Sequence, residues 1–170
     1  MKVELLPLGA VPRDVIRRLA DRLAAYGVVG ERLEGIGLPP DASVKATEQY
    51  DADGILARLA AHPHDSTLLA VTDADLASGR FNFVFGLADS EERVAVVSTY
   101  RLGREGDSLL EERLVKEALH EVGHTLGLSH CVNTGCVMQF SSSLADTDAK
   151  GHRFCERCSG RIPLTGIGRL

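Results

Sequence analysis

The stretch HEVGHTLGLSH, residues 120–130, holds three histidines and one glutamate at spacings that suit a metal ion. His120 and His124 are four residues apart, so on a helix they lie one turn apart on one face and can direct imidazole nitrogens at one metal. Glu121 lies about 100° further around the helix, where it can reach a metal-bound water without being a ligand. This HExxH pattern is the zinc-hydrolase signature, in which the glutamate takes a proton from a water that zinc has acidified.

Two further residues extend the signature to HExxHxxGxxH. Gly127 stands three residues after His124, and His130 stands three after Gly127. Glycine lets a helix end in a left-handed turn that residues with a Cβ adopt reluctantly. That turn can bring His130 back to the metal as a third ligand and leave the fourth position of zinc for water. A bare HExxH can arise by accident in an amphipathic helix, but the longer pattern is expected by chance in roughly one of 10⁴ chains of this length.

The four cysteines form two close pairs, Cys131 with Cys136 and Cys155 with Cys158. Two such pairs are typical of a tetrahedral Cys₄ zinc site. The alternatives are two disulfides, or a redox-active CxxC at Cys155 and Cys158 that would leave the other pair unexplained. The N-terminus lacks a signal-peptide pattern, so we expect a cytoplasmic protein, and disulfides are rare in that compartment.

His130 and Cys131 are adjacent, so their side chains must serve different metals. The sequence therefore predicts two neighbouring sites that share a backbone segment and hold two zinc ions per chain, one catalytic and one structural. His152 lies near the cysteines, but four thiolates already saturate tetrahedral zinc, so we do not expect it to be a ligand. His62 and His64 flank a proline at a predicted helix end, and we interpret them as surface histidines.

A long helix must position the first two histidines. Ser108 and Glu111 have the spacing of a capping box, and apolar residues then recur every fourth position from Leu110 to Val122. We therefore expect a helix over about 109–127.

The preceding residues read as an α/β layer. Helical periodicity predicts helices over 12–26 and 53–62, and strands are expected within 3–8, 28–38 and 67–72. The β-rich runs 81–89 and 93–102 are separated by a polar turn, so we expect neighbouring strands with at least one antiparallel pairing. With 170 residues and 44% hydrophobic residues, the chain has the size and composition of one domain.

The segment HEVGHTLGLSHCVNTGCVM, followed later by CERC, resembles the archaemetzincin family in the metzincin clan of zinc metallopeptidases. The resemblance implies one α/β catalytic domain over residues 1–170, with a twisted, mostly parallel sheet, one antiparallel edge strand and a zinc-stabilised region over about 128–160. It also implies that Glu121 is the general base and that Met138 is the Met-turn methionine packed beneath the zinc. The implied zinc ligands are His120, His124 and His130 at the catalytic site and Cys131, Cys136, Cys155 and Cys158 at the structural site.

The sequence thus predicts a zinc metallopeptidase that acts on a peptide or protein substrate. We expect the substrate to pair as an added strand with the edge of the sheet, which we place in RVAVVSTY, residues 93–100. We expect no membrane association, because no stretch approaches the roughly 20 apolar residues of a membrane span. We also expect a monomer.

A different class of function is a zinc-stabilised binding protein. Arg153, Arg157 and Arg161 surround the second cysteine pair and could contact nucleic acid or an acidic partner. The net charge of −5 and the lack of aromatic residues there apart from Phe154 argue against nucleic acid, and a binding protein has no need of Glu121. A zinc enzyme that hydrolyses another bond is a third possibility, because the choice of an amide bond follows only from the family resemblance.

Overall fold

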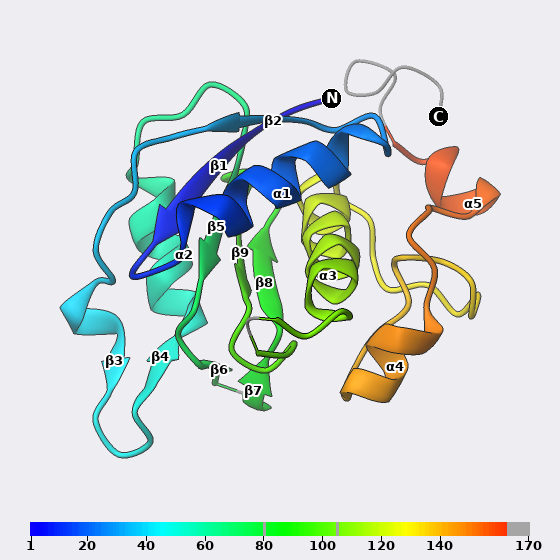
Figure 1. Cartoon of the computed structure of the whole chain (residues 1–170). Coiled ribbons are helices and arrows are strands. Elements are labelled where there is room, and N and C mark those ends of the chain that lie inside the picture. Colours follow the sequence, from blue (N-terminus) through cyan, green and yellow to red (C-terminus); the bar gives the residue numbers. More distant parts are fainter. Residues whose placement is uncertain (80, 105, 163–170) are drawn as a thin grey trace.

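Two β-sheets form the framework of the chain in the computed structural model, which describes residues 1–79, 81–104 and 106–162 (Figure 1). The larger sheet has the order β2-β1-β5-β9-β8, and the smaller has the order β3-β4-β6-β7. The strands of the larger sheet are β1 (Lys2–Leu8), β2 (Val29–Arg32), β5 (Thr67–Thr72), β8 (Gly86–Asp89) and β9 (Val94–Ser98). The smaller sheet, which the sequence did not predict, contains β3 (Ser43–Val44), β4 (Gln49–Asp51), β6 (Leu76–Ser78) and β7 (Phe81–Val84).

The larger sheet is parallel except at one edge, as expected. Strands β2, β1, β5 and β9 pair in parallel, whereas β8 pairs antiparallel with β9. The prediction that 93–100 contains the edge strand is wrong, because β9 pairs with β5 on one side and β8 on the other. Every residue of β5 and β9 is buried, which is typical of interior strands covered on both faces. The edge next to β9 is the partly buried strand β8.

Helices cover both faces of this sheet (Figure 1). Side chains of α1 (Arg13–Ala24) and α3 (Leu110–Thr125) form one hydrophobic core with one face, and α2 (Ala52–Ala60) forms a second core with the other. Strand β1 supplies both cores in alternation, since Leu5 belongs to the first and Leu6 to the second. The remaining helices are the short 3-10 helix η1 (Pro40–Ala42), α4 (Leu144–Ala149) and α5 (Glu156–Ser159). Among the described residues, no helix is both long and apolar enough to cross a membrane.

The start of α3 differs from the predicted capping box. Leu109 is the N-cap and no side chain caps the helix there, while the Asp107 carboxylate accepts a hydrogen bond from the Leu109 backbone N–H at 2.9 Å. Glu111 does not reach back to Ser108, because it forms an ion pair with Arg18 of α1 at 2.6 Å. The acidic first turn therefore serves helix docking as well as the helix dipole.

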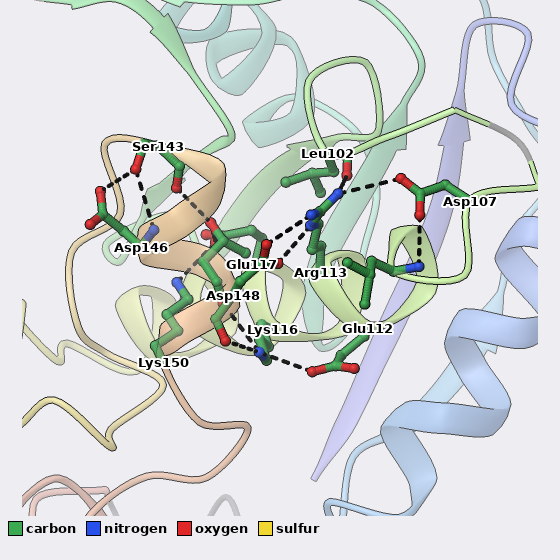
Figure 2. A network of polar contacts seen from close by, with 12 residues as sticks. Leu102, Asp107, Glu112, Arg113, Lys116, Glu117, Ser143, Asp146, Asp148 and Lys150 are labelled. Atoms are coloured by element: carbon green, nitrogen blue, oxygen red, sulfur yellow. Dashed lines mark hydrogen bonds and ion pairs between the residues drawn. The ribbon is translucent and has the colours of Figure 1, made fainter.

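Polar contacts attach α4 to α3 (Figure 2). Arg113 donates to both carboxylate oxygens of Asp148, at 2.7 and 2.8 Å. Lys116 is buried and donates to the backbone carbonyls of Thr147 and Asp148 near the end of α4. The Lys116 bonds satisfy helix-end carbonyls, and both sets of bonds fix α4 beside the first half of α3.

Candidate active site and metal centres

Helix α3 brings the first two predicted ligands together. The Nε2 atoms of His120 and His124 are 3.0 Å apart, as the four-residue spacing on a helix predicts. The Nδ1 atom of each ring lies against a backbone carbonyl, that of Val137 for His120 at 2.8 Å and that of Leu128 for His124 at 2.7 Å. When each Nδ1–H donates a hydrogen bond to its carbonyl, the two Nε2 lone pairs face each other. A cation bound between the two Nε2 atoms removes the repulsion between these lone pairs.

The turn after α3 brings in the third histidine. Gly127 has a φ of 81°, so the predicted left-handed turn is confirmed. The backbone N–H of Leu128 donates to the Gly123 carbonyl, and that of Gly127 donates to the His124 carbonyl, which together form a Schellman motif. One ligand atom each of His120, His124 and His130 lies within 4.8 Å of the others. Three imidazole nitrogens that converge in this way, with two of them oriented by carbonyls, fit a zinc ion with one open coordination position.

Glu121 is buried beside these histidines. Burial raises its pKa well above the usual glutamate value, and the neighbouring Glu117 carboxylate raises it further. Burial also lowers the pKa of His120 and, less strongly, that of His124, so both imidazoles favour the neutral form that binds metal. The site therefore combines metal-binding imidazoles with a carboxyl group suited to proton transfer.

A buried ion pair lies behind His120, and the sequence did not predict it. Lys150 is fully buried, and its Nζ atom lies 3.0 Å from Glu117 Oε1 (Figure 2). The same Nζ atom lies 3.4 Å from His120 Nδ1. Thr147 donates a hydrogen bond to the same Glu117 oxygen at 2.8 Å. The position of Glu117, one helical turn before Glu121, is a signal that points to Glu117 alone. Nothing near Lys150 in the sequence marks it as the partner of Glu117.

The four cysteines also converge. One Sγ atom from each of Cys131, Cys136, Cys155 and Cys158 lies within 4.8 Å of the others, and none of the four forms a disulfide. The backbone N–H of Asn133 and the Arg157 guanidinium lower the pKa of Cys131 to about 6, although burial opposes the shift. Four thiols, one of them readily ionised, fit a closed tetrahedral zinc site.

Met138 contacts the chain next to both clusters. It is fully buried, and its sulfur fills the space beside Gly123 in which any side chain at that position would stand. Its carbonyl accepts a hydrogen bond from the backbone N–H of Cys131 at 2.8 Å. The methionine therefore packs against the helix segment between the first two histidines and also anchors the chain next to His130.

The other histidines belong to neither cluster, and the nearby arginines make contacts within the chain. His62 and His64 contact backbone carbonyls near the surface, and His152 stacks on Tyr26 at 5.5 Å. Arg157 contacts the sulfur of Cys131 at 3.3 Å, and Arg153 lies 5.6 Å from the Tyr26 ring. Two of the three arginines in the predicted basic region thus make contacts within the chain.

A cleft of about 740 Å³ opens beside the histidines. The three histidines and Glu121 line it, together with Glu117 and residues of β7 and β8. A cleft of this size accommodates several side chains of a peptide. The edge strand β8, rather than the interior strand β9, lines this cleft.

Comparison with known proteins identifies the family. The model of peptidase family M54 matches residues 44–163. An archaemetzincin of Pyrococcus abyssi is 39% identical over 178 residues, covering 93% of this chain and 92% of its own. The chain belongs to peptidase family M54.

Solved structures of similar proteins share the fold. A crystal structure of archaemetzincin from Archaeoglobus fulgidus, complexed with malonate, aligns with a TM-score of 0.86 at 36% identity and covers 95% of this chain and 100% of its own. A zinc-dependent peptidase from Methanocorpusculum labreanum aligns with a TM-score of 0.83 at 31% identity and the same coverage. The expected archaemetzincin fold is therefore confirmed, and the chain is a zinc metallopeptidase.

Proposed function

We propose that this M54 peptidase hydrolyses peptide bonds with a catalytic zinc held by His120, His124 and His130, and with Glu121 as the general base. The observation that carries the proposal is the convergence of the three imidazoles beside a buried carboxyl group in a cleft of about 740 Å³. When bound, zinc supplies Lewis acidity, which lowers the pKa of a water and polarises the carbonyl of the scissile bond.

The chain's own residues orient the ligands and move the proton. The carbonyls of Val137 and Leu128 fix the tautomer and the orientation of the His120 and His124 rings. A Glu121 carboxylate oxygen takes a proton from the attacking water and then passes it to the leaving amine. Burial suits this role, because a raised pKa brings the carboxyl group closer to neutral pH, where it both accepts and donates a proton.

We propose that the substrate pairs with strand β8. Within the described residues, β8 pairs only with β9 and so presents a free edge. A Cβ placed at Gly86 of β8 would come within 2.7 Å of the Glu121 side chain, so the strand runs directly beside the proposed base. A peptide added to this edge would therefore pass alongside Glu121.

We further propose that Cys131, Cys136, Cys155 and Cys158 hold a second, structural zinc, so that each chain binds two. A site with four thiolates leaves no coordination position for a substrate, but it fixes the loop that carries His130. The free cysteines agree with a reducing compartment such as the cytoplasm. We also propose that residues 1–170 act as one catalytic domain and as a monomer.

The test is cleavage of a diverse peptide mixture by zinc-loaded protein, followed by mass spectrometry. The matched variant is Glu121→Ala, with zinc content measured on both samples. We expect the variant to keep its zinc and to lose cleavage by about 10²- to 10⁴-fold. Unchanged cleavage by the variant would show that Glu121 is not the general base.

A further inference from the structure

Phenylalanines are concentrated in the cleft. The chain has five, and four of them, Phe81, Phe83, Phe85 and Phe140, line it. Apart from the three histidines, the ionisable residues among those lining it are Glu117 and Glu121, both beside the zinc ligands. The rest of the lining is apolar or neutral. The cleft therefore combines a charged reaction centre with a wall suited to apolar groups.

Two of these rings meet next to the proposed catalytic zinc. Phe81, from β7, and Phe140, from the segment after Met138, have ring centroids 6.4 Å apart. The Phe140 ring centroid lies 4.9 Å from that of His130. Both rings are unusually exposed for phenylalanine, at 53% and 46%. Exposed aromatic rings grouped in a cleft mark a surface that gains stability when an apolar partner covers it.

Phe83, which lines the cleft beside these two rings, is held in place by its neighbours. The Arg101 guanidinium lies 4.5 Å from the Phe83 ring centroid, and the edge of the Phe85 ring packs on Phe83 at 5.4 Å. Arg101 is itself fixed by two hydrogen bonds of 2.6 Å to Asp75.

The segment that carries Phe140 is also fixed. The Asp146 carboxylate accepts hydrogen bonds from the Ser142 backbone N–H and from the hydroxyl groups of Ser142 and Ser143. These contacts restrain the residues that adjoin Phe81 and Phe140, which reduces the conformational freedom that is lost on binding.

We propose that Phe81 and Phe140 form a specificity subsite for a large apolar side chain, aromatic by preference, at one of the two residues that flank the scissile bond. This inference rests on the proposed peptidase function and names its substrate class. The contact between Phe140 and His130 places the subsite next to the reacting carbonyl. An aromatic side chain can stack on both rings, whereas a carboxylate or ammonium group would lose its hydration without gaining a partner.

The first test uses cleavage sites. Zinc-loaded wild type should show enrichment of Phe, Tyr, Leu or Met over Asp and Glu at one position flanking the cleaved bonds of a proteome-derived peptide mixture. Phe140→Ala should remove that enrichment and lower kcat/KM for a Phe-containing peptide by about 10- to 100-fold, while Phe140→Leu retains an apolar preference. Tyr100→Ala is the matched control, because Tyr100 is an aromatic residue that is 60% exposed but does not line the cleft. Cleavage without any such preference would overturn the subsite and leave the peptidase function intact.

A second test needs no turnover. Two blocked hexapeptides that differ only in one central Phe or Asp are titrated calorimetrically into zinc-loaded Glu121→Ala protein and into Glu121→Ala/Phe140→Ala protein. The Phe peptide should bind at least about 10-fold more tightly to the first protein, and the difference should vanish in the second. Equal affinities for Glu121→Ala would overturn the proposal, whether or not the wild type cleaves peptides.

Discussion

The histidine cluster and the cysteine cluster are neighbours in the chain but are built in different ways. His120 and His124 lie on a 16-residue helix, and backbone carbonyls orient their imidazole rings. The buried ion pair of Lys150 and Glu117 packs behind that helix. Cys131 and Cys136 lie in loops, Cys155 is the N-cap of the four-residue helix α5, and Cys158 lies within that helix. A long helix thus positions two of the three histidines without a metal, whereas little regular structure positions the cysteines. We infer that zinc at the cysteine site maintains the fold, and that zinc at the histidine site can be removed with the fold retained.

The largest effect should come from removing one ligand from each site. Cys136 is fully buried, and Cys136→Ser should cost more than about 5 kcal/mol of unfolding free energy, because the metal that organises the loops is lost. His124→Ala should abolish peptide cleavage but cost only about 1 kcal/mol. Thermal melting, zinc content and activity of the two variants check this contrast. Similar melting temperatures for both would remove the distinction between the sites.

An intermediate effect is expected from the buried pair behind His120. Lys150→Met should cost about 3 to 5 kcal/mol, because it leaves the Glu117 carboxylate buried without its cation. Adding Glu117→Gln should recover most of that loss. The control is Lys2→Met, since Lys2 pairs with Glu31 on the surface and the change should leave the unfolding free energy nearly unchanged.

Urea unfolding of these variants, with and without zinc, measures the contribution of the pair. If Lys150→Met destabilises only the zinc-loaded protein, the ion pair does not shape the site independently of the metal.

The smallest effect concerns the contact between α3 and α4. The Arg113 guanidinium lowers the pKa of Asp148 below its usual value, although partial burial opposes the shift. A carboxylate with a lowered folded-state pKa stabilises the fold above its unfolded pKa of about 3.9, and this contribution is lost as the pH falls through the folded pKa. The contribution should be under about 1 kcal/mol, because the Asp148 side chain is 41% exposed.

The pH dependence of unfolding for wild type and Asp148→Asn isolates this term, since effects common to both proteins cancel in the difference. The difference should be present at pH 7 and shrink towards pH 3. A difference that is constant over that range would show that the carboxylate charge contributes nothing.

Local spacing was sufficient to predict the helix α3, the turn at Gly127 and the convergence of the three histidines and of the four cysteines. His120, Glu121, His124 and Gly127 fall within eight residues, so helix geometry alone relates them. The edge strand was misplaced because strand order depends on pairing between distant segments. Even so, the unbroken apolar run VAVVS already resembled an interior strand more than an edge.

Features that depend on tertiary contacts could not be found in this way. Lys150 joins Glu117 only because α4 folds back onto α3, and Phe81 meets Phe140 only because β7 lies beside the segment after Met138. The capping box failed for the same reason, since Glu111 pairs with Arg18 of another helix. Tertiary partners thus replaced local ones at each of these positions.

Stepwise removal of zinc with a chelator tests the contrast between the two sites most directly, with zinc content, peptide cleavage and circular dichroism followed on the same sample. The first equivalent of zinc lost should remove all cleavage and leave the helical signal and the melting temperature nearly unchanged. Loss of the second should unfold the C-terminal region. If the first equivalent leaves with the fold intact and cleavage undiminished, or if both leave together with the fold, the assignment of an open catalytic site and a closed structural site is contradicted.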